Sequence, residues 1–169
     1  MNLYNLTVVN NVTFTTNGYV QQAAVFTSGS NQMLIGPYVP LLSTSFTVET
    51  WIYITQLLSI TDHSIIGLCP SASTRQCLHI TIRLSSSNYY LYFGFYGDDC
   101  RGVLPVKLNT WIHVACVFDL TLMKKFIYFN GILDNSCASQ TFQATVDNVT
   151  IGYISSIVSS SPNNYFRVR

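Results

Sequence analysis

Tyrosines on one predicted strand and polar side chains on the strand before it form the most informative candidate binding surface. The run 78–84 alternates apolar and polar residues, and the run 89–96 alternates tyrosines with apolar side chains. If the Ser/Asn stretch 85–88 turns the chain, the two strands pair and share one outward surface. The residues on that surface are His79, Thr81, Arg83, Tyr90, Tyr92 and Tyr96. Tyrosine rings can stack on a sugar while hydroxyl and guanidinium groups bond its hydroxyls, so the pattern predicts carbohydrate binding.

An ordinary half-exposed sheet face is the alternative explanation for the same residues. Tyrosine and threonine are favoured in strands because they pack well across a pleated surface. Under this explanation the face is structural and holds no ligand.

The acidic segment Gly97-Asp98-Asp99-Cys100 is a candidate metal site. Its two carboxylates, with Asn130 and Asp134 or Asn135 from a neighbouring predicted hairpin, could give oxygen ligands to calcium (Ca²⁺). Calcium takes six to eight oxygens, usually with several carboxylates, whereas the chain has only seven acidic residues. The alternative is a solvated turn in which aspartate acts as a turn former. Asp62-His63 lies in a further candidate loop.

The sequence offers little for hydrolytic catalysis. A glycosidase needs two carboxyl groups about 5–10 Å apart, but Glu49 is the only glutamate. The neighbouring aspartates Asp98 and Asp99 would point to opposite faces of a strand. The three histidines occur without a Gly-x-Ser-x-Gly nucleophile turn. We therefore predict that the chain is not an enzyme.

Five cysteines suggest two disulfides and one free thiol. Cys69 and Cys77 flank a Pro/Ser-containing loop between two strand-like runs and can close it. Cys100 and Cys137 remain as a pair in predicted loops, although the sequence alone leaves the connectivity open. Cys116 lies within an apolar strand, where a free thiol acts as a small hydrophobic side chain. No Cys/His spacing resembles a zinc site.

Three Asn-x-Thr sequons begin at Asn5, Asn11 and Asn148. Together with the cysteines they favour a glycoprotein in an extracellular or cell-surface setting. The segment Met1–Asn5 has neither the basic nor the apolar region of a signal peptide. We therefore expect either an excised or partial chain or a non-secretory setting.

Composition and periodicity predict one all-β domain over residues 1–169. Charged residues make up 9% of the chain, against roughly 25% in an average domain. The net charge of +1, with no basic cluster, argues against nucleic acid, and no apolar run approaches the roughly 20 residues of a transmembrane helix. Apolar residues recur with a period of two in roughly ten predicted strands. Asn17-Gly18 and Asn130-Gly131 predict tight hairpin turns.

Four ordered motifs resemble those of a known fold family. The motifs are Ser45–Ile52, Trp111–Ala115, Ile127–Gly131 and Val149–Gly152. Over about residues 18–155 they resemble the core strands of the laminin-G-like, concanavalin A-like jelly-roll family. The resemblance implies an antiparallel β-sandwich with Trp51 and Trp111 in its core. It also implies an extracellular module that binds carbohydrate or protein, often with calcium at one rim, although some relatives are glycosidases.

The resemblance weakens at the end of the chain. The family closes with a strand reading roughly Phe-x-Gly-x-Ile-Asp, whereas here Asn164-Tyr165-Phe166 is followed by Arg167-Val168-Arg169. We therefore expect a missing or altered last strand. A neighbouring strand would then keep an open edge that favours association.

Three functional hypotheses follow. The first is a non-enzymatic module that binds a glycan or glycoprotein through its rim loops or the tyrosine-bearing face. The second is a structural or adhesive module of a larger protein, which would bind protein by surface or edge-strand contact. A divergent glycoside hydrolase is the least favoured, and fold resemblance alone does not decide among the three.

Overall fold

The computed structural model of the chain describes residues 5–27, 30–58, 62–71, 73–144 and 146–154. These residues form thirteen strands and no helix, and every paired strand is antiparallel to its neighbour. The described part therefore holds no helix that could cross a membrane. The predicted all-β fold is confirmed, and the expected closing segment 164–169 lies outside the described residues.

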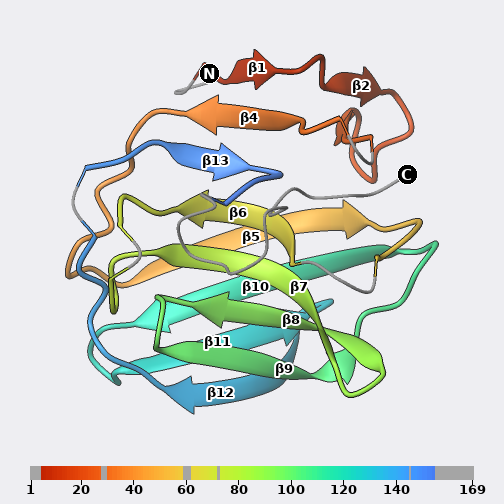
Figure 1. The fold of residues 1–169 in the computed structure, drawn as a ribbon. Helices are drawn as coiled ribbons and strands as arrows, with labels where there is room; N and C mark the ends of the chain where they lie inside the picture. The colour runs from red at the N-terminus through yellow and green to blue at the C-terminus, as the bar shows by residue number, and fades with distance from the viewer. Residues whose placement is uncertain (1–4, 28–29, 59–61, 72, 145, 155–169) are drawn as a thin grey trace.

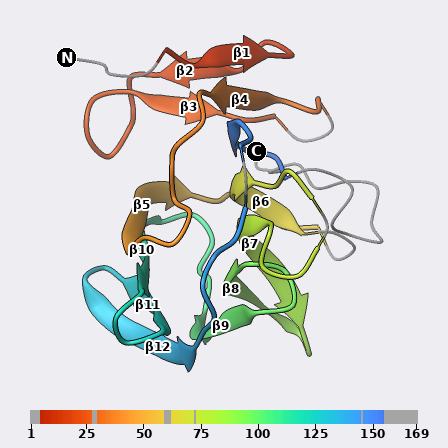
Figure 2. The same cartoon turned by 90° about the vertical axis from the view of Figure 1, so that its left-hand side faces the viewer.

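Two sheets and a short ribbon make up the molecule (Figure 1). The larger sheet contains, in spatial order, β1 (Thr7–Val9), β4 (Met33–Gly36), β13 (Val149–Ile151), β6 (His63–Leu68), β7 (Leu78–Ser85), β8 (Asn88–Gly94) and β9 (Asp99–Pro105). The smaller sheet contains β12 (Ile132–Ala138), β11 (Lys124–Phe129), β10 (Trp111–Asp119) and β5 (Phe46–Tyr53). The ribbon pairs β2 (Thr13–Thr15) with β3 (Ala23–Val25). Figure 2 shows the smaller sheet facing β6–β9, with the N-terminal strands at one end.

The hydrophobic core lies between the two sheets. Strands β7 and β8 contribute inward side chains that are at most 2% exposed, namely Ile80, Ile82, Leu91 and Phe93. The facing side chains of the smaller sheet include Ile52, Ile112, Val114, Cys116, Phe118 and Ile127. The alternation expected for β7 and β8 is confirmed, because one parity fills the core and the other faces outward.

Trp51 and Trp111 lie outside this core, contrary to the prediction. Their neighbours Ile52 and Ile112 point inward, so the tryptophans face the outer surface of the smaller sheet, where both are half-buried. Tyr19 covers Trp51 there, with the ring centres 3.5 Å apart. The core position had been inferred from the family resemblance, whereas the alternation of β5 itself puts Phe46, Val48 and Ile52 on the inward side.

The two Asn-Gly signals have different outcomes. Asn130 and Gly131 form a two-residue turn between β11 and β12, with φ angles of 49° and 78°, as predicted. Asn17-Gly18 also lies between paired strands, β2 and β3, but the connecting loop covers residues 16–22. Within that loop Gly18 N–H donates to the carbonyl of Gln21 at 3.1 Å. The stacking of Tyr19 on Trp51 draws the loop away from a tight turn.

Both predicted disulfides are present. Cys69 is bonded to Cys77, and Cys100 is bonded to Cys137. The second bond joins β9 of the larger sheet to β12 of the smaller one. Cys116 is free and buried, as predicted, and burial raises the pKa of its thiol.

Candidate functional site

The outer face of β7 and β8 carries the predicted tyrosine surface. The strands form a hairpin through a turn at residues 86–87, and the register pairs Arg83 with Tyr90 and Thr81 with Tyr92. Since Ile82, Leu91 and their inward neighbours fill the core, these four side chains face away from it. The expected hairpin is confirmed.

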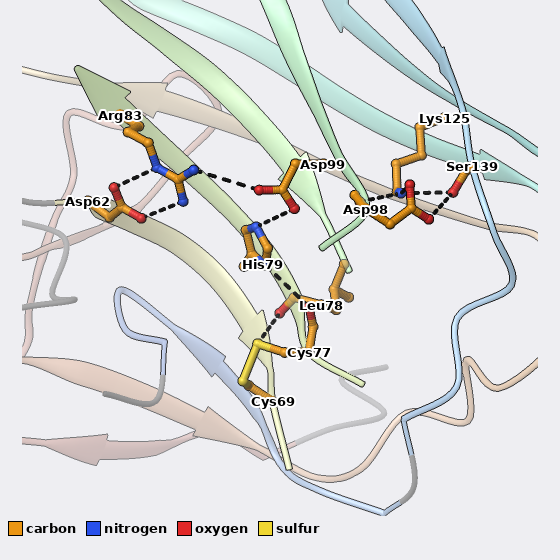
Figure 3. A network of polar contacts seen from close by, with 10 residues as sticks. All are labelled: Asp62, Cys69, Cys77, Leu78, His79, Arg83, Asp98, Asp99, Lys125 and Ser139. Carbon is orange, nitrogen blue, oxygen red and sulfur yellow. Dashed lines mark hydrogen bonds and ion pairs between the residues drawn. A yellow bond between two sulfur atoms is a disulfide. The ribbon is translucent and has the colours of Figure 1, made fainter. Parts of the chain in front are cut away.

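Arg83 is the best-anchored side chain of this face. Its Nε and Nη2 donate to the two carboxylate oxygens of Asp62 at 2.8 and 2.7 Å, and its Nη1 lies 3.7 Å from Asp99 (Figure 3). The guanidinium carbon also lies 4.5 Å from the ring centre of Tyr92. Burial acts to lower the pKa of Arg83, but the hydrogen bonds and charge of Asp62, with Asp99, outweigh it and raise that pKa. The contacts fix the guanidinium beside the tyrosine ring.

Tyr90 has a second arginine beside it. The guanidinium carbon of Arg101, on β9, lies 5.0 Å from the Tyr90 ring centre, and Nη1 of Arg101 donates to Ser85 Oγ at 3.1 Å. Arg101 is exposed. Arg101 was missed in the sequence because Gly97–Cys100 was interpreted as an acidic loop and no strand was assigned after it, whereas β9 begins at Asp99 and places Arg101 opposite Tyr92. A strand predicted from Asp99 onwards would have placed Arg101 beside the tyrosine-bearing strand.

His79 and Thr81 lie on the same face but are buried. His79 Nε2 lies 3.1 Å from Asp99 Oδ1, and Nδ1 lies 3.2 Å from the carbonyl oxygen of Cys77. Gly94 makes room for this pair, because a side chain there would collide with His79 and Asp99. Burial acts to raise the pKa of Asp99, but His79 and then Arg83 lower it overall. His79 and Asp99 therefore help to fix the position of Arg83 on this face.

The structure does not bring Tyr96 to this face. Strand β8 ends at Gly94, and Tyr96 follows in a bend with φ of 64°. Its side chain packs against the small cluster that contains Cys69, Cys77 and Ile154. The accessible part of the candidate site therefore consists of the half-buried Arg83, Tyr90 and Tyr92 and the exposed Arg101.

The predicted calcium ligands Asp98 and Asp99 point to different partners, as expected for neighbouring residues (Figure 3). Asp98 Oδ1 lies 3.0 Å from Lys125 Nζ, and Asp98 Oδ2 accepts from Ser139 Oγ and Gln140 N at 2.9 and 2.8 Å. These contacts occupy the carboxylate of Asp98 with protein donors.

The other predicted calcium ligands also form hydrogen bonds to protein groups. Asp134 accepts from the backbone N–H groups of Val103 and Leu104 at 2.8 and 2.9 Å, and Asn130 Oδ1 accepts from His113 N at 2.9 Å. Asn135 donates to the carbonyl of Arg101 at 2.8 Å. Among the described residues no three acidic, histidine or cysteine side chains gather as a metal site. The residues predicted for calcium therefore do not fit that ion.

The three sequon asparagines are exposed. Asn5 precedes β1, Asn11 lies between β1 and β2, and Asn148 precedes β13. All three lie at the end of the larger sheet that contains β1, β4 and β13.

A family model described as the concanavalin A-like lectin/glucanases superfamily matches residues 26–167. The match agrees with the resemblance inferred from the sequence motifs. Among curated proteins none matches the chain.

Several solved structures share the fold. Domain 4 of an extracellular GH43 arabinanase from Geobacillus stearothermophilus, in complex with arabinotriose, has a TM-score of 0.64 and 16% identity, over 88% of this chain and 72% of that one. The CBM40 domain of the Ruminococcus gnavus IT-sialidase, bound to α2,3-sialyllactose, has a TM-score of 0.53 and 14% identity, over 73% and 70%. The binding domain of Botulinum neurotoxin DC in complex with SialylT has a TM-score of 0.62 and 15% identity, over 88% and 38%. At these identities the likeness shows the fold.

Proposed function

The chain belongs to the concanavalin A-like lectin/glucanase superfamily, and from that premise we propose that it is a non-enzymatic module that binds carbohydrate on the outer face of β7 and β8. The observation that carries the proposal is the pairing of two tyrosine rings with two guanidinium groups, Arg83 with Tyr92 and Arg101 with Tyr90. Aromatic rings offer apolar surface to a sugar, and phenol and guanidinium groups offer hydrogen bonds to its hydroxyls. The structures of the same fold in complex with arabinotriose and with α2,3-sialyllactose support this class of ligand.

The charges of the face favour a neutral sugar. Arg83 is neutralised by the bidentate contact with Asp62 and by the nearby Asp99. Of the two arginines on this face, Arg101 is the one for which the described residues provide no carboxylate contact. A single exposed positive charge would bind a strongly anionic glycan only weakly, because such a ligand needs several charge-assisted hydrogen bonds.

The carboxylates of the face do not suit glycoside hydrolysis. A glycosidase keeps one carboxyl group protonated with a raised pKa, to act as general acid. Here the neighbouring positive groups lower the pKa of Asp99, and Asp62 is held in the ion pair with Arg83. Both carboxylates therefore serve to position the arginine and histidine side chains.

A glycan array tests the proposal directly. We expect the purified chain to retain neutral glycans, and the Tyr90→Ala/Tyr92→Ala double variant to lose at least about tenfold in affinity, because truncating a buried-contact aromatic ring costs more than about 1.4 kcal/mol. Retention should survive EDTA, since the predicted metal ligands are occupied by protein donors.

Phe14→Ala is the matched control, because Phe14 is a similarly bulky aromatic side chain exposed on β2, away from the face. It should bind as the unaltered chain does. Unchanged retention by the tyrosine double variant would remove this face as the site. Release of reducing ends from β-glucans would overturn the non-enzymatic assignment.

A protein-binding module is the second candidate function. Val103 and Leu104 on β9 and Ile132 and Leu133 on β12 are all more than half exposed, and the Asp134 hydrogen bonds to Val103 and Leu104 bring these four residues together. Such an aliphatic patch suits protein contact. Because Asp134 occupies two backbone N–H groups of β9, this contact would use side chains rather than strand addition. This function would be favoured if the glycan array showed no binding and if a protein partner bound the unaltered chain but not the Leu133→Asp variant.

We also propose an extracellular setting. Two disulfides and three exposed sequon asparagines support it. Intact-mass measurement of the protein secreted from a glycosylating host, before and after enzymatic removal of N-glycans, would check it.

A further inference from the structure

The outer surface of the smaller sheet carries a second cluster of aromatic side chains. Tyr19 stacks on Trp51 at 3.5 Å and meets the edge of Trp111 at 6.2 Å. Tyr53 lies 5.4 Å from Trp111, and His113 lies 5.0 Å from Trp51, measured between ring centres. The β5–β10 register explains the arrangement, because it pairs Trp111 with Tyr53 and His113 with Trp51. We call these five residues the aromatic ridge.

The ridge is open to solvent at its two tyrosines. Tyr19 is 54% exposed and Tyr53 is 39% exposed, although both touch tryptophan rings. Tyr19 has a structural role, since its stacking on Trp51 holds the 16–22 loop against the sheet. That role uses one face of the phenol ring, whereas the exposed fraction shows that much of the side chain remains accessible.

One carboxylate lies at the His113 end of the ridge. Glu49 is paired with Ala115 and so lies diagonal to His113, with its carboxylate 3.7 Å from His113 Nε2, and the Glu49 side chain is 67% exposed. The carboxylate therefore keeps accessible lone pairs next to aromatic surface. It is the one glutamate of the chain, and the proposed function of the β7–β8 face does not use it.

We propose that the aromatic ridge is a second carbohydrate-binding site, which takes a neutral oligosaccharide across Tyr19 and Tyr53 and bonds its hydroxyl groups through Glu49. The ring faces would cover the C–H surface of the sugar, and the carboxylate would accept hydrogen bonds from adjacent hydroxyls. A sugar fits better than a protein partner because the ridge combines exposed phenol rings with an exposed carboxylate, whereas aliphatic surface gathers on β9 and β12. No residue of the β7–β8 face takes part, so each of the two sites can be tested independently of the other.

The tryptophans make this site directly observable. The chain contains only two tryptophans, and both belong to the ridge, whereas the β7–β8 site contains tyrosines. A ligand on the ridge should change tryptophan emission, and a ligand restricted to the β7–β8 face should not. The probes are arabinotriose, xylotriose, cellotriose and chitotriose, each titrated into the full chain.

We expect at least one probe to change tryptophan emission saturably, in the unaltered chain and equally in Tyr90→Ala/Tyr92→Ala. Tyr53→Ala and Glu49→Gln should each weaken that titration, Tyr53→Ala by at least about tenfold for a lost stacking contact. Neither change touches the loop that Tyr19 holds. Phe14→Ala, which removes an aromatic side chain exposed to a similar degree as Tyr19, should leave the titration unchanged.

Three results would overturn the second site. The first is the absence of any emission change with all four probes. The second is an emission change that Tyr90→Ala/Tyr92→Ala abolishes, because the signal would then come from the other face. The third is a titration that Tyr53→Ala and Glu49→Gln leave intact. Loss of retention by Tyr90→Ala/Tyr92→Ala on the array with no ridge signal would leave the proposed function standing and remove only this inference.

Discussion

The ammonium group of Lys125 lies 3.0 Å from Oδ1 of Asp98, in the interior of the sandwich. Lys125 Nζ also donates to the carbonyl of Asp98 at 2.7 Å and to Ser139 Oγ at 2.8 Å, and it lies 3.9 Å from the ring centre of Phe95. Burial lowers the pKa of Lys125, and Asp98 acts in the opposite direction. The pair ties β11 to the residue that precedes β9. Asp99, the next residue, contacts the buried His79 and, on the tyrosine-bearing face, Arg83.

Replacing Lys125 should therefore destabilise the fold strongly. Lys125→Met leaves the half-enclosed carboxylate of Asp98 without its cation, and breaking such a buried pair costs about 3–5 kcal/mol. Urea unfolding measured by circular dichroism gives this difference. The control is Lys124→Met, since Lys124 is exposed and makes no ion pair within the described residues. A loss for Lys125→Met no larger than for Lys124→Met would contradict the assigned role.

The ion pairs of Asp99 should make stability depend on acid pH. The pKa of Asp99 is lowered in the folded state from its ordinary 3.8, so ionisation favours folding. This contribution is fully present above the unfolded pKa of about 3.9 and disappears as the pH falls through the lower folded value. Asp99→Asn should cost about 1 kcal/mol at neutral pH, and the difference from the unaltered chain should shrink towards pH 2. A difference that stays constant from neutral to strongly acid pH would rule out the ion pairs as its cause.

Gly94 should not accept a side chain. A methyl group there collides with His79 and with the carboxylate of Asp99, so Gly94→Ala should cost about 1–3 kcal/mol as an overpacking change. Gly36→Ala is the matched control, because an added Cβ at Gly36 lies 3.1 Å from the end of the Leu6 side chain and in ordinary contact, 3.8 Å, with the carbonyl oxygen of Val149. Thermal unfolding of both variants measures the contrast. Equal stability of the two variants would show that the His79–Asp99 pair can move aside at little cost.

The two disulfides should differ in what their removal costs. Cys100–Cys137 spans 37 residues and Cys69–Cys77 spans 8. The loop-entropy model then gives about 4 kcal/mol for the first and about 2.5 kcal/mol for the second. Urea unfolding of Cys100→Ser/Cys137→Ser and of Cys69→Ser/Cys77→Ser should reproduce that order, and the reverse order would mean that native packing around the bonds outweighs chain entropy.

Turns and hairpins were predictable from the sequence, whereas contacts between residues far apart in the chain were less so. The Asn130-Gly131 turn depends on two positive φ angles that those residues adopt readily, so two letters of sequence suffice. The β7–β8 hairpin follows from alternation on both sides of a short polar turn. Asn17-Gly18 carries the same signal, but the contact of Tyr19 with Trp51, on a distant strand, changed the loop.

The candidate site shows the same limit. Tyr90, Tyr92 and Arg83 were found because they lie on neighbouring strands joined by one turn. The position of Arg101 beside Tyr90 and the ion pair between Asp62 and Arg83 were not found. Both depend on a strand or loop that approaches from elsewhere in the chain. The misplacement of Trp51 had another cause, because its core position was inferred from the family resemblance, whereas the alternation of β5 places Phe46, Val48 and Ile52 on the inward side.

The bonds between β9 and β12 should make that edge of the molecule more resistant to local unfolding than the end that contains β1–β4. The Cys100–Cys137 disulfide and the Asp134 hydrogen bonds join the two sheets at that edge. At the opposite end, β1 to β4 are only three or four residues long, and no cysteine lies among them. Native-state hydrogen exchange should therefore be fastest in β1–β4 and slowest around β9–β12, and a protease should make its first cut near the N-terminal strands. The β7–β8 face lies towards the slowly exchanging end, so a chain nicked in this way would keep its carbohydrate-binding surface.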